Sequence, residues 1–99
     1  MMKLIMTWDI RPGREAAYFD WAIKTFVPRL MEMGLQPVDA WYTVHGDAPQ
    51  MLAGVLAEDR ETLSAALGSA EWQELRSELM TYITNYSQKV VKATSSFQF

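Results

Sequence analysis

The 99 residues have room for one domain, covering positions 1–99, and for no second one. The chain contains no cysteine, which excludes a disulfide framework, a thiol nucleophile and a thiolate metal site. The net charge is −3 and the nine lysines and arginines are dispersed, so the sequence offers no basic patch for a nucleic-acid backbone.

The first residues predict a strand. Leu4, Met6, Trp8 and Ile10 alternate with other residues over positions 3–11, and a period of two is typical of a strand with two unlike faces. The apolar run is too short to span a membrane, and no small-residue cleavage site follows it. We therefore expect a soluble cytoplasmic protein without a membrane partner.

A long helix is expected next, from about residue 14 to residue 33, with Gly34 as its stop. Apolar residues at spacings of three and four predict the face that packs on a sheet: Ala16, Phe19, Ile23, Phe26, Val27 and Leu30. Pro28 removes a backbone donor inside this pattern, so the helix should kink or restart there. Trp21 falls on the far side, which favours either a half-exposed tryptophan or a contact with a partner subunit.

The central segment, residues 36–58, predicts a hairpin. Residues 38–45 alternate in character, residues 46–49 supply turn chemistry, and residues 51–57 are nearly continuous in apolar side chains. The last pattern indicates a strand in the middle of a sheet with both faces covered. Gly54 within it predicts a bulge or a close approach by another group.

The remaining chain predicts two helices and a final strand. Asp59 is a suitable N-cap for a short helix through Leu67, and Ser69 is suitable for a second helix over residues 70–86. The buried stripe expected for that second helix consists of Trp72, Leu75, Leu79, Tyr82, Ile83 and Tyr86. Residues 88–97 should form the last strand, and their few apolar positions favour an edge strand or one face of a dimer contact.

The order β-α-β-β-α-β predicts an α+β fold of the ferredoxin-like type, a four-stranded antiparallel sheet with the helices on one face. The other face should carry either Thr7, Asp9, Asp39, Trp41, Thr43 and His45 or their neighbours, and neither set is uniformly polar. Small monomers rarely expose a large apolar patch, so we expect a homodimer in which two sheets pack face to face.

Several segments resemble the dimeric α/β-barrel superfamily, in its NIPSNAP-like and antibiotic-biosynthesis-monooxygenase-like branches. They are the aromatic second strand ending in His45-Gly46, the helix end VPRLMEMGL, and the Ser69-Ala-Glu-Trp72 helix start. The resemblance covers nearly the whole chain. It implies a barrel closed by two subunits and a ligand cleft between sheet and helices, in a superfamily that includes cofactor-free oxygenases, haem-handling enzymes and isomerases.

His45 is the only histidine and the first candidate for a catalytic base. Asp9 or Asp39 would orient it if their strands are neighbours, and a half-exposed histidine beside the turn is the alternative. One histidine and dispersed carboxylates give no metal-ligand cluster, so we expect no metal and no cofactor. For haem-degrading members of the superfamily, the resemblance implies a trio of Asn, Trp and His. The only asparagine here, Asn85, is far from His45 in sequence.

Five aromatic residues are candidates for lining a ligand cleft, with core packing as the alternative for each: Trp8, Trp41, Tyr42, Trp72 and Tyr82. The resulting hypothesis is a small homodimeric barrel protein that binds a small apolar or aromatic organic ligand. It would be a cofactor-independent monooxygenase or isomerase, with His45 and Asp9 as catalytic candidates. The alternative is a structural or regulatory dimer without chemistry.

Overall fold

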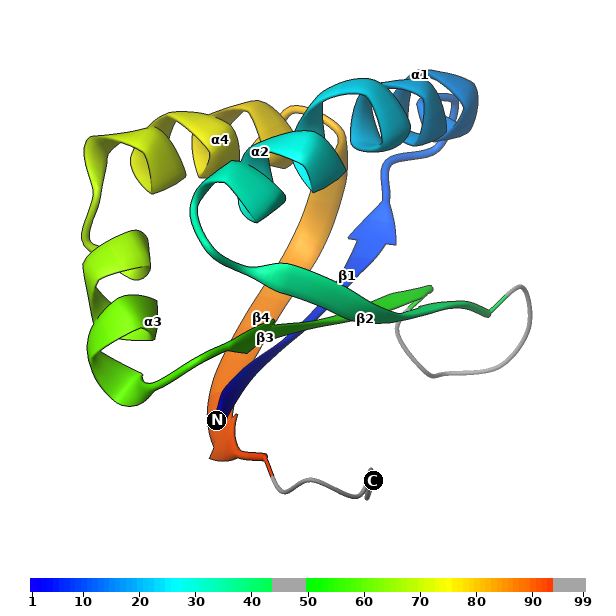
Figure 1. Cartoon of the computed structure of the whole chain (residues 1–99). Helices are drawn as coiled ribbons and strands as arrows, with labels where there is room; N and C mark the ends of the chain where they lie inside the picture. Colours follow the sequence, from blue (N-terminus) through cyan, green and yellow to red (C-terminus); the bar gives the residue numbers. More distant parts are fainter. Residues whose placement is uncertain (44–49, 94–99) are drawn as a thin grey trace.

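The computed structural model describes residues 1–43 and 50–93 and has the predicted order of elements (Figure 1). The elements in chain order are β1 (Met2–Ile10), α1 (Glu15–Trp21), a π-helical turn η1 (Ala22–Phe26), α2 (Val27–Glu32), β2 (Gln36–Tyr42), β3 (Met51–Ala57), α3 (Arg60–Leu67), α4 (Ala70–Met80) and β4 (Ile83–Lys92). The sheet order is β2-β3-β1-β4 and every neighbouring pair is antiparallel. The predicted ferredoxin-like fold is confirmed.

The strand alternation divides the sheet into two faces, as predicted. Leu4, Met6, Trp8 and Ile10 of β1 are buried on the face that the helices cover. Residues directly opposite each other in an antiparallel ladder share a face. The helix-free face therefore carries Lys3, Ile5, Thr7, Asp9, Asp39, Trp41, Leu52, Gly54, Leu56, Thr84, Ser87, Lys89 and Val91.

The first helix is interrupted just before Pro28, as expected, but its buried face differs from the predicted one. Proline has no N–H to give to the carbonyl four residues earlier, and the π-helical turn η1 precedes it. The wider turn shifts the phase of the helix, so Tyr18 and Phe26 are buried while Ile23 is 72% exposed. The predicted stripe was therefore wrong at Ala16, Ile23 and Val27.

The same shift buries Trp21, so the expectation of a half-exposed or partner-facing side chain was wrong. Its ring stacks on Phe26 and on Tyr82, at centroid distances of 5.2 Å and 5.1 Å. Its indole N–H donates to Glu78 Oε2 of α4 at 2.9 Å. This contact joins the first helix to α4 above the sheet.

The last helix ends six residues earlier than predicted. α4 stops at Met80, and β4 begins at Ile83, which pairs with Ile10 of β1. The apolar positions after residue 80 fit a helical period, but β-branched residues at 81, 83 and 84 suit a strand, and pairing with β1 decides between them. Part of the strand predicted over residues 88–97 lies outside the described residues.

The helix caps and the central strand agree with the predictions. The Asp59 carboxylate accepts from the Thr62 N–H at 2.8 Å, and the Ser69 hydroxyl accepts from the Trp72 N–H at 3.1 Å. Met51–Ala57 is a central strand, and β4 is an edge strand. No helix among residues 1–43 and 50–93 is long and apolar enough to cross a membrane.

Candidate ligand-binding site

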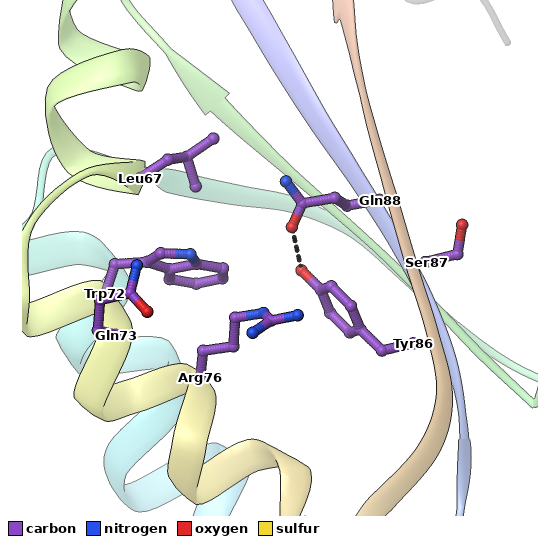
Figure 2. Close-up of a pocket in the computed structure, with 7 residues that line it drawn as sticks. All are labelled: Leu67, Trp72, Gln73, Arg76, Tyr86, Ser87 and Gln88. Carbon is purple, nitrogen blue, oxygen red and sulfur yellow. Dashed lines mark hydrogen bonds between the residues drawn. The ribbon is translucent and has the colours of Figure 1, made fainter.

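A pocket of about 330 Å³, open to solvent, lies between α4 and β4 (Figure 2). Ser69 fixes the start of α4, and residues four apart on a helix lie on one side, so Trp72 and Arg76 both reach the pocket. On β4, Tyr86 and Gln88 are two residues apart and share the helix-covered face. The complete lining is Leu67, Trp72, Gln73, Arg76, Tyr86, Ser87 and Gln88.

The polar groups of the pocket form one connected arrangement. The Tyr86 hydroxyl donates to Gln88 Oε1 at 2.7 Å, and the Arg76 guanidinium lies over the Tyr86 ring, 5.2 Å from its centroid. Burial raises the pKa of Tyr86 to about 12, although the positive charge of Arg76 acts in the opposite direction. The phenol is therefore neutral at physiological pH and is not a base there.

Aromatic rings form the apolar part of the site and continue behind it into the core. Trp72 is only 3% exposed, and the Tyr86 ring stacks on Trp8 at 6.1 Å with an interplanar angle of 12°. The Trp8 indole N–H lies beside the Tyr18 hydroxyl but makes no well-aligned hydrogen bond with any described residue. Burial raises the pKa of Tyr18 to about 12, and Trp8 partly offsets that rise.

The structure brings only one of the five aromatic candidates to this pocket, Trp72. Trp8 and Tyr82 belong to the core rings, with Tyr82 also under the Arg14 guanidinium at 4.7 Å. Tyr42 meets the edge of Phe19 at 5.4 Å and is half exposed. Trp41 is 67% exposed on the helix-free face. The five residues therefore do not line one common cleft among the described residues, and their roles as ligand contacts stay predictions.

Asp9 lies on the helix-free face of the sheet, opposite the pocket. Its carboxylate accepts from Asn85 Nδ2 at 2.8 Å and from the Gln50 N–H at 3.0 Å. The bond from Asn85, followed by that from Gln50, lowers the pKa of Asp9 and keeps it ionised. His45, its predicted catalytic partner, lies outside the described residues, so the pair stays a prediction.

Asp39 is engaged in a different interaction. Its Oδ2 lies 2.5 Å from Lys3 Nζ, in an ion pair on the helix-free face. Its strand β2 is separated from β1 by β3, so Asp39 and Asp9 are on strands that are not neighbours.

Sequence reasoning missed three functional candidates, Arg76, Tyr86 and Gln88. Assigning residues 70–86 to a helix separated Tyr86 from Gln88, whereas β4 places both on one face. Assigning residues 83–92 to a strand would have placed Tyr86 and Gln88 on one face. Only the packing of α4 against β4 brings Arg76 to them.

Comparisons with known proteins show the fold. No protein-family profile and no curated protein matches the sequence. HapK from Hahella chejuensis superimposes with a TM-score of 0.80 at 10% identity, over 100% of this chain and 98% of that one. An uncharacterised NIPSNAP domain protein from Burkholderia xenovorans gives 0.74 at 11% identity, over the whole of both chains. A candidate antibiotic biosynthesis monooxygenase from Nitrosomonas europaea gives 0.66 at 13% identity, over 93% and 97%.

The expected likeness to NIPSNAP and antibiotic-biosynthesis-monooxygenase proteins is thus confirmed at the level of fold. At 10–13% identity it carries no activity, substrate or assembly over to this chain.

Proposed function

We propose that this protein binds a small aromatic organic ligand in the pocket between α4 and β4 and works as a homodimer. The observation that carries the ligand proposal is the combination of an aromatic lining with a guanidinium and amide groups in one cavity of about 330 Å³. Ligand pockets have volumes of roughly 300–1,000 Å³ and a few convergent polar groups. A ligand of one or two fused rings suits the lower end of that range.

Binding is tested by calorimetric titration of one-ring and two-ring aromatic compounds into the wild-type protein and two tryptophan variants. Gln73→Trp places a large ring in the pocket, whereas Ser77→Trp adds the same ring to an exposed position of α4 outside the lining. We expect Gln73→Trp to weaken binding at least tenfold and Ser77→Trp to leave the affinity unchanged. Equal affinities in both variants would place the ligand elsewhere.

The helix-free face supports the dimer proposal. Ile5, Leu52 and Leu56 are only half-buried there, and Trp41 is largely exposed. A second copy of the sheet would cover these side chains. Truncating a buried aromatic residue costs about 3–5 kcal/mol, so Trp41→Ala should weaken association strongly. Sedimentation equilibrium measures the strength of association, and Val90→Ala on the opposite face of the sheet is the control. A Trp41→Ala variant that still sediments as an unaltered dimer would refute the role of Trp41 in association.

The activity that we propose for this site is that of a cofactor-independent monooxygenase or of an isomerase. A phenol would take one oxygen atom from dioxygen and become a quinone, and the other oxygen atom would leave as water with two hydrogen atoms of the substrate. The described lining residues include no carboxylate or imidazole, and His45 stays the predicted base. Oxygen uptake with phenols that bind, lost in His45→Ala, is the expected result.

The second candidate function is a structural or regulatory dimer without chemistry. It is favoured by the close packing of Trp8 and Trp72, which are 1% and 3% exposed. It predicts a cleft filled by tryptophan and methionine side chains, and a His45→Ala variant with unchanged stability and assembly. The cytoplasmic location and the exclusion of nucleic-acid and membrane partners stay predictions.

A further inference from the structure

We propose that the ligand of the α4–β4 pocket is an aromatic carboxylate, and that Arg76 is the residue that selects its negative charge. This inference rests on the proposed ligand-binding function and names the substrate class of the same site. It depends on the charge of Arg76, which no carboxylate of the described residues neutralises, on the donors around it, and on the residues that line the pocket.

Arg76 has a positive charge that no described carboxylate pairs with. Ion pairs among residues 1–43 and 50–93 involve Lys3, Lys24 and Arg29, and none reaches Arg76. Arg76 is an exposed residue, and its side chain extends from α4 toward the Tyr86 ring, so the guanidinium lies at the open pocket (Figure 2). A guanidinium presents its N–H groups as a planar fork that matches the two oxygens of a carboxylate.

The neighbouring polar groups also favour an acceptor-rich ligand group. Gln88 Oε1 already accepts from the Tyr86 hydroxyl, so the donor end of the Gln88 amide is the part left for a ligand. Gln73 adds a second side-chain amide to the lining. Because burial raises the pKa of Tyr86 to about 12, that phenol does not become an anion that would repel a carboxylate at neutral pH.

The apolar lining indicates that the carboxylate is attached to an aromatic ring. Trp72 and Leu67 lie on the α3–α4 side and the Tyr86 ring lies on the β4 side, with Arg76 between them (Figure 2). Trp72 is only 3% exposed, so Leu67 and the Tyr86 ring supply most of the apolar surface that a flat ring contacts while its acidic substituent reaches the guanidinium. An aliphatic acid would bind to the Arg76 guanidinium but would make no ring contact with the aromatic side chains of the lining.

The test compares 2-naphthoate with its uncharged analogue 2-naphthamide by isothermal titration calorimetry at pH 7 and low salt. A charge-assisted hydrogen bond is about twice as strong as a neutral one, and we expect the wild-type protein to bind the naphthoate roughly 10- to 100-fold more tightly. Arg76→Gln should remove this preference, so that this variant binds the naphthoate no more tightly than the naphthamide. Arg76→Lys should keep only part of the preference, because an ammonium does not form the bidentate pair.

Arg14→Gln is the matched control, since Arg14 also lies over a tyrosine ring, Tyr82, but outside the pocket lining. It should retain the full preference for the naphthoate. Equal binding of naphthoate and naphthamide by the wild-type protein would overturn the assignment of an anion while leaving the pocket as an aromatic site. Failure of both compounds to bind at millimolar concentration would overturn the pocket itself. A preference that survives in Arg76→Gln would assign the selection to another residue and overturn the role of Arg76.

Discussion

Replacing Gly54 by alanine should disturb the ion pair between Lys3 and Asp39 on the helix-free face. Gly54 faces Asp39 across a bulge between β2 and β3, and Lys3 and Asp39 meet in front of it. A Cβ at this position would lie 2.8 Å from Lys3 Cε and 2.9 Å from Asp39 Oδ2, at least 0.5 Å closer than the 3.4 Å at which ordinary van der Waals contact begins. The close approach expected from the sequence is therefore confirmed.

The expected loss of stability in Gly54→Ala has two parts. Overpacking of a filled site costs about 1–3 kcal/mol. The two side chains are 8% and 20% exposed, so moving them apart also leaves charges with poor hydration. We expect Gly54→Ala to lower the free energy of unfolding by roughly 2–4 kcal/mol in urea titrations at fixed protein concentration.

Two controls separate this effect from a general cost of alanine. Gly68→Ala at the end of α3 meets only Ser64 O at 3.3 Å and has no positive φ, so it should change stability by less than about 1 kcal/mol. Gly54→Ala in a Lys3→Ala, Asp39→Ala background should also cost little, because the blocking atoms are gone. The steric explanation is refuted if Gly54→Ala costs the same in both backgrounds.

Three further predictions follow from other contacts. Trp21→Phe removes the N–H that donates to Glu78 and should destabilise the protein by about 1–2 kcal/mol in thermal unfolding, with Glu78→Gln losing less because it keeps an acceptor. Tyr18 and Tyr86 should ionise near pH 12 in absorbance titrations that compare each phenylalanine variant with the wild type. Each of these pKa values is higher in the native state than in the unfolded chain, where it is 10.0. The contribution of the two tyrosines to stability should therefore be fully present below pH 10 and be lost between pH 10 and 12. Ser69→Ala removes an N-cap and should cost about 1 kcal/mol, whereas Ser69→Asp should retain stability in the same denaturant titration.

The fold was predictable because its determinants are local in the sequence. Alternation marked β1 and β2, a nearly continuous apolar run marked β3, and side-chain oxygens at Asp59 and Ser69 marked two helix starts. Gly54 identified a close approach without naming the groups involved. Each of these signals depends on neighbours within a few positions, so the sequence alone was sufficient.

The candidate site was predictable only in part. Trp72 was named as a ligand contact, and its helical position holds in the structure. Arg76 and Tyr86 were not named as ligand contacts, because they come into contact only when α4 ends at Met80 and β4 pairs with β1. The contact between Asn85 and Asp9 joins residues 76 positions apart, and no local pattern indicates it.

The sequence by itself determined the order of the elements, both N-caps of the later helices, and the interruption before Pro28. Only the tertiary structure decided the face that the first helix buries, the end of α4, and the pairing of Lys3 with Asp39. Periodicity and capping record preferences of a single segment, whereas a helix phase, a strand start or an ion pair is selected by what packs against it. That competition among segments distant in the chain also forms the pocket between α4 and β4.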